Sequence, residues 1–435
     1  MIARKWKIRH ALLASALLSV IMYACDQQRS LELRLTNLAH LNHLYEEVTI
    51  DAQPMAIIHI YSEYPEYKWV DASHEGIACV DDAARAAVVY LRHFEITGDT
   101  MSLHRGRQLL EFCRYMQAED GLFYNFILAD HSINRDGKTS YKSLGWWTAR
   151  ALWAMGEGYR IFRLREPDYA MLLQNHIQKT FPHIDTLLAH FPRMDTANGF
   201  LMPRWLLHNS AADATSELMV GLARYMAVSN DQRVHEYLRK FSRGLVAMQL
   251  GDAKNYPYGV FLSWQNIWHG WGNGQTQALT LVAQLLNDEK ILEAAETEVK
   301  FFYPYWQTHG WLREIAFVHD NGFRAAHIDT FPQIAYALRP MIVGALQLAQ
   351  ITQNHHYAEL AGELATWFFG NNPAHAPMYD PQTGRGYDGI LSTTQINRNA
   401  GAESTIEAVY SILEVEANTA ARKILYKRIN GLLDK

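Results

Sequence analysis

The stretch Ile77-Ala-Cys-Val-Asp-Asp-Ala-Ala-Arg-Ala-Ala-Val-Val-Tyr-Leu91 is the part of the chain that decides its fold. It sets two adjacent carboxylates, Asp81 and Asp82, before a run rich in alanine. Acidic side chains in the first turn of a helix face the positive end of its dipole, so the stretch predicts a helix that begins beside this pair. Because that helix is small and apolar on most sides, we expect it to lie inside the protein.

Similar small-residue helices recur along the chain. Their sequences are Thr148-Ala-Arg-Ala-Leu, Ala214-Thr-Ser-Glu-Leu-Met, Gln275-Thr-Gln-Ala-Leu, Ile342-Val-Gly-Ala-Leu and Ser404-Thr-Ile-Glu-Ala. The equivalent positions are Ala86, Ala151, Leu218, Ala278, Ala345 and Ala408, and the steps between them are 65, 67, 60, 67 and 63 residues. Nearly constant spacing over six units indicates one helical hairpin repeated around the chain.

Each small-residue helix is followed by a polar turn and then by a more charged amphipathic helix, which belongs on the outside. We expect these outer helices at 102–117, 169–180, 232–249, 289–303, 356–369 and 419–433. Together the inner and outer helices predict an all-α fold, a closed (α/α)6 toroid that forms a single domain over residues 61–435. Residues 26–60 are predicted to be a small N-terminal extension; a helix is expected at 31–47 and a short strand at 55–67.

The loops of this pattern are unequal in length. Turns from an inner to an outer helix are short, whereas the connections back to the next inner helix are long and carry most of the reactive side chains. These connections are 67–80, 123–147, 200–212, 256–273, 311–340 and 379–402. All of them open at the same end of the ring, so that rim is the predicted functional face.

Carboxylates on the rim suggest acid and base chemistry. Cleavage of a glycosidic bond needs a protonated acid at the leaving oxygen and an ionised base or nucleophile across the sugar ring. Asp81 and Asp82 are neighbours on a helix, so their side chains diverge and their partner must come from another repeat. Closure of the ring brings the sixth repeat beside the first, which makes Glu403 the predicted partner. The alternative is that these residues only cap their helices.

Aromatic and polar side chains crowd the same loops. Aromatic rings stack on the apolar faces of sugars, and a wet pocket of this kind is the usual candidate for a binding site. The predicted substrate-binding residues are Trp69, His74, Glu75, Arg85, Trp146, Trp147, Trp268, Trp271, Tyr387, Asp388 and Asn399. The rim histidines lack a metal-ligand spacing, and His74-Glu75 has no second histidine of a zincin motif, so we expect neither a metal nor another cofactor.

Composition limits the possible partners. The formal net charge is −5 and the folded part has no long basic run, which argues against binding of nucleic acid. Twelve tryptophans and 23 tyrosines supply many rings for a carbohydrate groove. Besides Cys25 only Cys79 and Cys113 are present, so the fold does not depend on a framework of disulfides.

The N-terminus has the features of an export signal. Basic residues precede an apolar run at 11–24 that is short for a membrane span, and the run ends at Cys25. Residues 1–25 resemble a bacterial lipoprotein signal, which implies lipidation of Cys25 and a membrane-anchored protein in the periplasm or cell envelope. Ordinary secretion and an uncleaved anchor are the alternatives.

The pattern of six hairpins resembles the (α/α)6 six-hairpin glycosidase superfamily over residues 60–435. Near the end, Gly370-Asn-Asn-Pro, Gly384-Arg-Gly-Tyr-Asp-Gly and Asn399-Ala-Gly are similar to the closing motifs of family 9 glycoside hydrolases. That family has a glutamate as general acid where this chain has Thr393, and its two N-terminal aspartates are separated where Asp81 and Asp82 are adjacent. The resemblance therefore implies the fold and a carbohydrate substrate rather than cellulase activity.

These observations predict a glycoside hydrolase acting on an oligo- or polysaccharide, with Glu403 as general acid and Asp81 or Asp82 as base. Inversion at the anomeric carbon is implied by analogy with the superfamily. A uronate-handling polysaccharide lyase or a sugar epimerase stays open, using His74 or Tyr387 with Arg385. A non-catalytic glycan-binding lipoprotein is the third possibility.

Overall fold

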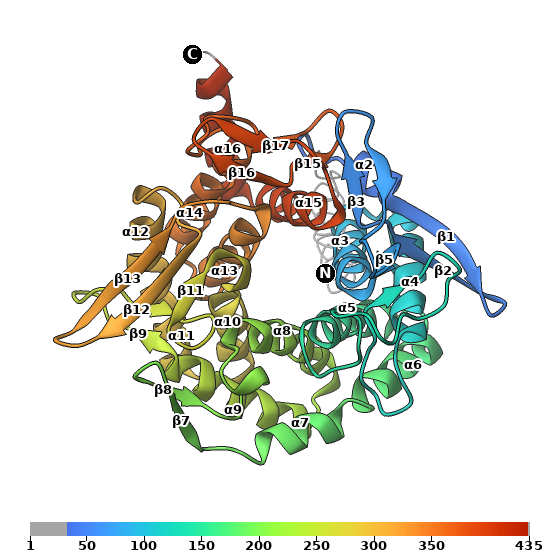
Figure 1. Cartoon of the computed structure of the whole chain (residues 1–435), viewed down its shortest axis with the longest axis horizontal. Helices are drawn as coiled ribbons and strands as arrows, with labels where there is room; N and C mark the ends of the chain where they lie inside the picture. Colours follow the sequence, from blue (N-terminus) through green and yellow to red (C-terminus); the bar gives the residue numbers. More distant parts are fainter. Residues whose placement is uncertain (1–32, 434–435) are drawn as a thin grey trace, which may run out of the picture.

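The computed structural model describes residues 33–433, and within them the helices form a ring (Figure 1). The inner helices are α3 (Val80–Thr97), α5 (Trp146–Phe162), α8 (Ala212–Ser229), α10 (Gln275–Leu286), α13 (Leu338–Thr352) and α15 (Ala402–Ala417). Each packs against the next, and α15 packs against α3, so the last hairpin lies beside the first. The predicted (α/α)6 toroid is confirmed.

An outer layer of helices surrounds this ring (Figure 1). It consists of α4 (Thr100–Tyr115), α6 (Pro167–Gln178), α7 (Phe181–Leu188), α9 (Gln232–Ala247), α11 (Glu289–Thr297), α12 (Tyr303–Thr308), α14 (His355–Ala365) and α16 (Thr419–Leu433). A π-helical turn, Glu298–Phe302, joins α11 to α12. The polar turns start the outer helices, because the side chains of Asp99, Asp231, Asp288 and Asn354 accept hydrogen bonds from backbone N–H groups of the first turn.

The inner helices pack closely because their facing residues are small. Gly156 on α5 and Gly221 on α8 face each other's helix, and a methyl group added at either glycine would collide with the backbone of the other helix. Close approach of the two backbones leaves no room for a side chain at this crossing. The small-residue pattern is thus the reason that these helices line the inside of the ring.

Short antiparallel strands lie in the long connections, at the end of the ring where the inner helices begin (Figure 1). They are β5 (Ala78–Cys79) with β6 (Phe126–Ile127), β7 (Met194–Ala197) with β8 (Phe200–Pro203), β9 (Gln249–Leu250) with β10 (Val260–Phe261), β14 (Tyr379–Asp380) with β15 (Arg385–Gly386), and β16 (Gly389–Ser392) with β17 (Gln395–Asn397). A larger sheet joins β11 (Ile267–His269), β12 (Glu314–His319) and β13 (Phe323–Asp329).

The N-terminal extension differs from its prediction. The helix expected at 31–47 is reduced to α2 (Ala39–Leu44), because the chain then forms β1 (Tyr45–Ile50), which pairs with β2 (Gln53–Ile58). Two further strands, β3 (Tyr61–Glu63) and β4 (Lys68–Val70), pair with each other in a separate sheet. The β2 strand packs on α4 and the α2 helix packs on α15, so the extension covers the junction between the first and last hairpins.

The predicted signal segment and its lipidation site, Cys25, lie outside the described residues. Among residues 33–433, none of the helices combines the length and the apolar character needed to cross a membrane.

Candidate functional site

Two adjoining cavities open where the inner helices begin. The larger, of about 800 Å³, is called here the main cavity; it is lined by Asp81, Asn125, Phe126, Thr139, Trp146, Trp147, Arg150, His208, Ala211, Asp213, Trp264, His269, Trp271, Ile334, Tyr336 and Glu403. The smaller, the side cavity of about 210 Å³, shares Ile334, Tyr336 and Glu403 with it. Asp82, Asp388, Tyr61 and Ser404 are among its other lining residues.

Two carboxylates, one from the first repeat and one from the sixth, line the main cavity. Asp81 lies in the first turn of α3, where Nη1 of Arg150 is 3.0 Å from its Oδ1 and Nδ2 of Asn125 donates to its Oδ2 at 3.2 Å. Glu403 lies in the first turn of α15, and its Oε2 is 3.1 Å from Nη1 of Arg85. The Glu403 side chain is 44% exposed, which makes it the more accessible of the two.

Asp82 has a different environment from its neighbour. It is buried, its Oδ1 accepts from Nη2 of Arg85 at 2.9 Å, and its Oδ2 accepts from the Cys79 thiol at 3.2 Å. Burial raises the pKa of Asp82 from 3.8 to about 6, although the Arg85 guanidinium opposes the shift. Its carboxylate borders the side cavity, whereas that of Asp81 borders the main one.

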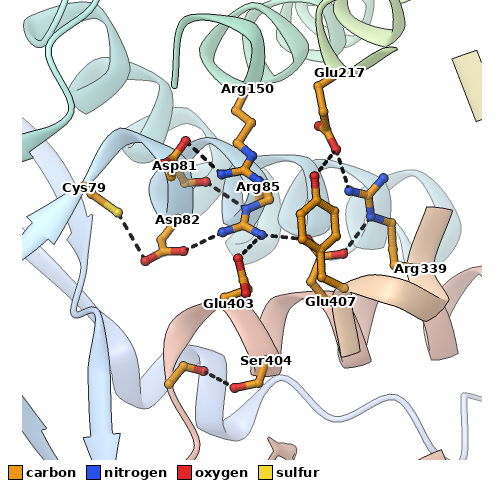
Figure 2. Close-up of polar contacts among 12 residues, drawn as sticks. Cys79, Asp81, Asp82, Arg85, Arg150, Glu217, Arg339, Glu403, Ser404 and Glu407 are labelled. Atoms are coloured by element: carbon orange, nitrogen blue, oxygen red, sulfur yellow. Dashed lines mark hydrogen bonds and ion pairs between the residues drawn. The ribbon is translucent and has the colours of Figure 1, made fainter. Parts of the chain in front are cut away.

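Arg85 connects the carboxylates of the first and sixth repeats (Figure 2). Its side chain is 3% exposed, and Nη1 donates to both Glu403 and Glu407, at 3.1 and 2.9 Å. With Asp82 on Nη2, three carboxylates surround one buried guanidinium. A buried charge is tolerated only when it is paired in this way, so the arrangement fixes Glu403 relative to α3.

A belt of polar side chains connects the inner helices, and one of its members, Arg150, borders the main cavity. The residue just before each equivalent alanine or leucine of the repeat is Arg85, Arg150, Glu217, Gln277, Gly344 or Glu407. Where the fifth repeat has glycine, Arg339 near the start of α13 supplies the charge instead. Its guanidinium donates to Glu407 at 2.7 Å and to Glu217 at 2.8 Å (Figure 2). It also donates to Gln277 at 2.6 Å. The belt therefore links α8, α10, α13, α15 and α3.

Tyr336 stands above this belt and borders both cavities. Its hydroxyl donates to Glu217 at 2.8 Å, and the guanidinium carbons of Arg85, Arg150 and Arg339 lie 5.6, 5.3 and 5.2 Å from its ring centre. Burial alone would raise the pKa of Glu217, but Arg339 and Arg150 outweigh it and the pKa is lowered. The aromatic ring of Tyr336 thus lies between three arginines, and its hydroxyl is held by the ionised Glu217.

A histidine and an aspartate form the opposite wall. Nε2 of His269, at the end of β11, is 3.2 Å from Oδ2 of Asp213 in the first turn of α8. The His269 ring stacks on Trp271 with a centroid distance of 4.1 Å. The β11 strand and α3 lie on opposite sides of the ring (Figure 1). His269 and Asp213 line the same cavity as Asp81 and Glu403.

The structure brings part of the predicted set to the two cavities. Asp81, Glu403, Trp146, Trp147 and Trp271 line the main cavity, and Asp82 and Asp388 line the side cavity. Asp388 accepts from the Gly401 N–H at 2.9 Å and the Ser404 hydroxyl at 2.5 Å, and burial raises its pKa. Arg85 acts behind the cavity wall through the carboxylates that it holds.

Other predicted residues lie elsewhere. Trp268 is 1% exposed and packs against Phe302 and Trp306, so it belongs to the core. Trp69 on β4 stacks on His59 at the N-terminal extension. His74 is exposed in a turn with a φ of 67°, and Glu75 accepts from the Thr139 N–H at 3.0 Å, which positions one wall of the main cavity.

The last two predicted binding residues, Tyr387 and Asn399, hold the connection before α15 in shape. The Asn399 amide oxygen accepts from the Tyr64 N–H at 3.0 Å, and the Tyr387 N–H donates to the Met378 carbonyl. Arg385, which the lyase alternative used, stacks over Tyr67 at 3.8 Å from the ring centre. Thr393, at the position of the family 9 acid, is exposed between β16 and β17.

Several site residues were absent from the prediction. Tyr336, Arg339 and Glu407 were not singled out, because each looks like an ordinary helix residue in the sequence. The signal for Glu407 was the repeat itself, since it occupies the same register as Arg85. Asn125 and Thr139 come from the loop before α5, and only the folded chain shows that they reach Asp81 and the cavity.

No family model matches the sequence, and no curated protein matches it. Solved structures do. A cellobiose 2-epimerase from Bacillus thermoamylovorans B4167 is similar with a TM-score of 0.59 and 11% identity, over 85% of this chain and 93% of that chain. The similarity extends over most of both chains and shows that they share a fold.

Two more solved structures share this fold. A sugar epimerase from a ruminal bacterium has a TM-score of 0.59 and 15% identity, over 88% of this chain and 96% of that one. A family 76 glycoside hydrolase from a bovine Bacteroides thetaiotaomicron strain has a TM-score of 0.56 and 13% identity, over 90% of this chain and 78% of that one. Identities this low establish the shared fold, and the reaction has to be argued from the site.

Proposed function

We propose that the protein is a carbohydrate-active enzyme that hydrolyses glycosidic bonds, with Glu403 as general acid and Asp81 as base. The observation that carries the proposal is that these carboxylates come from the sixth and first hairpins, face one cavity, and are each fixed by a different buried arginine. Acid and base for a glycoside must approach from different sides of the sugar, and carboxylates on separate helices are able to do so.

Asp81 suits the role of base better than Asp82. Asp82 is buried beside Arg85 and the Cys79 thiol, and its carboxylate borders the side cavity rather than the main one. Asp81 reaches the main cavity while Arg150 and Asn125 hold it in one orientation. Asp82 then acts on the reaction through Arg85, which it shares with Glu403.

The walls of the main cavity suit a sugar. Trp146, Trp147, Trp264 and Trp271 supply aromatic faces, and Trp264 is 41% exposed. The charged lining is mainly acidic: Asp81, Asp82, Asp213, Asp388 and Glu403 border the two cavities, against Arg150. Like charges repel, so we propose a neutral oligosaccharide as substrate rather than a uronate.

The test uses the full chain with neutral gluco-, manno- and xylo-oligosaccharides. New reducing ends would be measured, and the anomer first formed would be read by NMR. Glu403→Gln and Asp81→Asn are each expected to lower the rate by about 10²- to 10⁴-fold. Glu359→Gln, the same substitution at an exposed position on α14, is the control and should keep full activity. Cleavage that survives both site variants would refute the assignment.

A second candidate reaction is epimerisation or isomerisation of a sugar. It is favoured by the His269 and Asp213 pair, because a histidine oriented by a carboxylate is a suitable base for a C–H next to a carbonyl. The similar structures include proteins named as a cellobiose 2-epimerase and a D-mannose isomerase. Incorporation of deuterium from D₂O into an uncleaved sugar, lost in His269→Gln and kept in the exposed control His356→Gln, would select this reaction.

We also propose that the protein is exported and anchored through a lipid on Cys25. The support is the order of residues 1–25, in which basic residues are followed by an apolar run and then by Cys25. Metabolic labelling of the full chain with a fatty acid should tag the wild type, and Cys25→Ala should abolish the label. Labelling that persists in Cys25→Ala would reject the anchor.

A further inference from the structure

A third cavity, the distal cavity, lies where the inner helices end. Its volume is about 550 Å³, and every inner helix contributes to it: Arg92 from α3, Glu157 from α5, Arg224 from α8, Gln284 from α10, Gln347 from α13 and Glu414 from α15. The catalytic carboxylates stand in the first turns of α3 and α15, so this cavity is at the opposite mouth of the ring. None of the proposed chemistry uses it.

A partition separates the distal cavity from the main one. One turn beyond Arg150 on α5 is Trp153, and one turn beyond Glu407 on α15 is Tyr410. Their rings are 6.0 Å apart and almost fully buried, and the Arg339 guanidinium covers Trp153 at 4.9 Å. The distal cavity therefore has its own floor, with Tyr410 as its aromatic lining.

Charges around the distal cavity balance one another. Arg92 pairs with Glu414 at 2.6 Å, and Arg160 pairs with Glu95 at 2.5 Å. Glu157 extends this series of ion pairs, because it lies 2.9 Å from Arg160 and 2.8 Å from Arg224. Three arginines thus meet three glutamates, which gives an ionic ligand no net attraction but leaves many planar donors and acceptors.

Gln347 is the feature that points to an occupant. Its side chain lines the distal cavity, yet within the described residues neither its Oε1 nor its Nε2 has a hydrogen-bond partner, although both atoms are buried. Leaving a buried amide unpaired is costly, and native proteins rarely do it. Both atoms have almost no accessible surface, so a ligand reaches them only when the Gln347 side chain turns toward the cavity. A ligand that both donates and accepts hydrogen bonds would then satisfy the two atoms together.

We propose that the distal cavity is a second binding site, separate from catalysis, for a neutral saccharide. Guanidinium, carboxylate and amide groups bind adjacent sugar hydroxyls in pairs, and all three kinds of group line the distal cavity. The volume falls within the range of about 300–1,000 Å³ that is typical of small-ligand pockets. The balanced ion pairs fit an uncharged polyhydroxylated ligand better than an acidic one.

The experiment locates bound sugar by hydrogen–deuterium exchange of the full chain. Cellobiose, mannobiose and xylobiose are the neutral probes, and glucuronic acid is the anionic comparison. At least one neutral probe is expected to slow exchange in peptides that cover 343–353 and 410–418, also in the catalytic variant Asp81→Asn. This readout distinguishes the distal site from the main cavity and does not depend on turnover.

Two variants test the site itself. Gln347→Leu removes the unpaired amide, and Leu281→Trp fills the cavity from α10; each should weaken the distal protection by about tenfold or more in apparent affinity. Gln232→Leu at an exposed position and Leu164→Trp, at a leucine that is 82% exposed, are the matched controls and should bind as the wild type does.

Protection confined to rim peptides, or absent with every neutral probe, would overturn the proposal. So would distal protection that is unchanged in both Gln347→Leu and Leu281→Trp. Binding of glucuronic acid in preference to the neutral probes would contradict the inference about ligand charge.

Discussion

Nη1 of Arg85 on α3 lies 3.1 Å from Oε2 of Glu403 on α15, although 318 positions separate the two residues in the chain. The contact exists because the last hairpin of the ring returns to the first. Arg85 holds Asp82 with its other terminal nitrogen, so one guanidinium couples a buried acid to an accessible one. Both stability and activity should depend on this coupling.

Removal of the Arg85 charge should be severely destabilising. Arg85→Met leaves Asp82, Glu403 and Glu407 without their shared cation, and breaking a buried ion pair by removing one partner typically costs about 3–5 kcal/mol. Urea unfolding measures the loss. Arg428→Met, at a pair whose arginine is 60% exposed, is the control and should change little. An equal loss of unfolding free energy in the two variants would show that the buried ion pairs of Arg85 do not stabilise the fold more than an exposed pair does.

The activity should have an acid limb set by Asp82. Its pKa in the folded protein is about 6, so Asp82 is ionised and pairs with Arg85 above that pH, and is protonated below it. We expect activity to fall as the pH drops through about 6, because Arg85 then loses one of its carboxylates. Asp82→Asn mimics the protonated form, and its pH–rate profile should lack this limb at a reduced plateau. An unchanged limb in the variant would assign it to another group.

Glu298 should make stability depend on pH. It is buried in the π-helical turn, where it accepts from the Phe261 N–H at 2.8 Å and the Thr276 hydroxyl at 2.6 Å, and burial raises its pKa from 4.5 to about 7. Because the folded state holds the proton more tightly, this contribution to stability is fully present below pH 4.5 and is lost as the pH rises through 7.

The free energy linked to the Glu298 proton is about 3 kcal/mol for a shift of this size. Glu298→Gln keeps a donor and an acceptor at the site without a charge, so it should stabilise the protein at pH 8 relative to the wild type and have little effect at pH 4. Thermal unfolding at both values measures this, with the exposed Glu289→Gln on α11 as control. Destabilisation by Glu298→Gln at pH 8 would contradict the assignment.

The rim tryptophans should separate into binding and core residues. Trp268→Ala is expected to destabilise the fold by about 3–5 kcal/mol, because it empties a fully buried site. Trp146→Ala, at the cavity wall, should instead weaken sugar binding with little loss of stability. Calorimetry and unfolding of both variants measure the two effects. The exposed Trp69→Ala is the control for sugar binding; reduced binding in that variant would extend the site to β4.

The fold was predictable because its determinants are local. Small-residue helices and polar turns recur at nearly equal steps, and side chains such as Asp99 and Asp231 cap the outer helices within their own turns. The helix predicted at 31–47 was too long: α2 covers Ala39–Leu44, and residues 45–50 pair with 53–58 in a hairpin that packs on α4. Such packing overrides helix propensity.

The site was predictable in part. The repeat placed Asp81 and Glu403 on neighbouring inner helices and put several tryptophans on one rim. The repeat did not reveal Arg339, which lies five residues before Gly344 and supplies the charge that this glycine lacks. Nor did it show that the Trp268 side chain is buried in the core. Those outcomes depend on how side chains from several repeats fill one interior.

The sequence by itself determined the ring of hairpins and the end of the ring at which its reactive side chains gather. Only the tertiary structure decided between the adjacent acids: Asp81 borders the main cavity, whereas Asp82 is buried against Arg85 and Cys79. Neighbours on a helix point in different directions, and what each one meets is supplied by distant parts of the chain. Burial, pairing and pKa follow from those contacts, which the order of residues alone does not show.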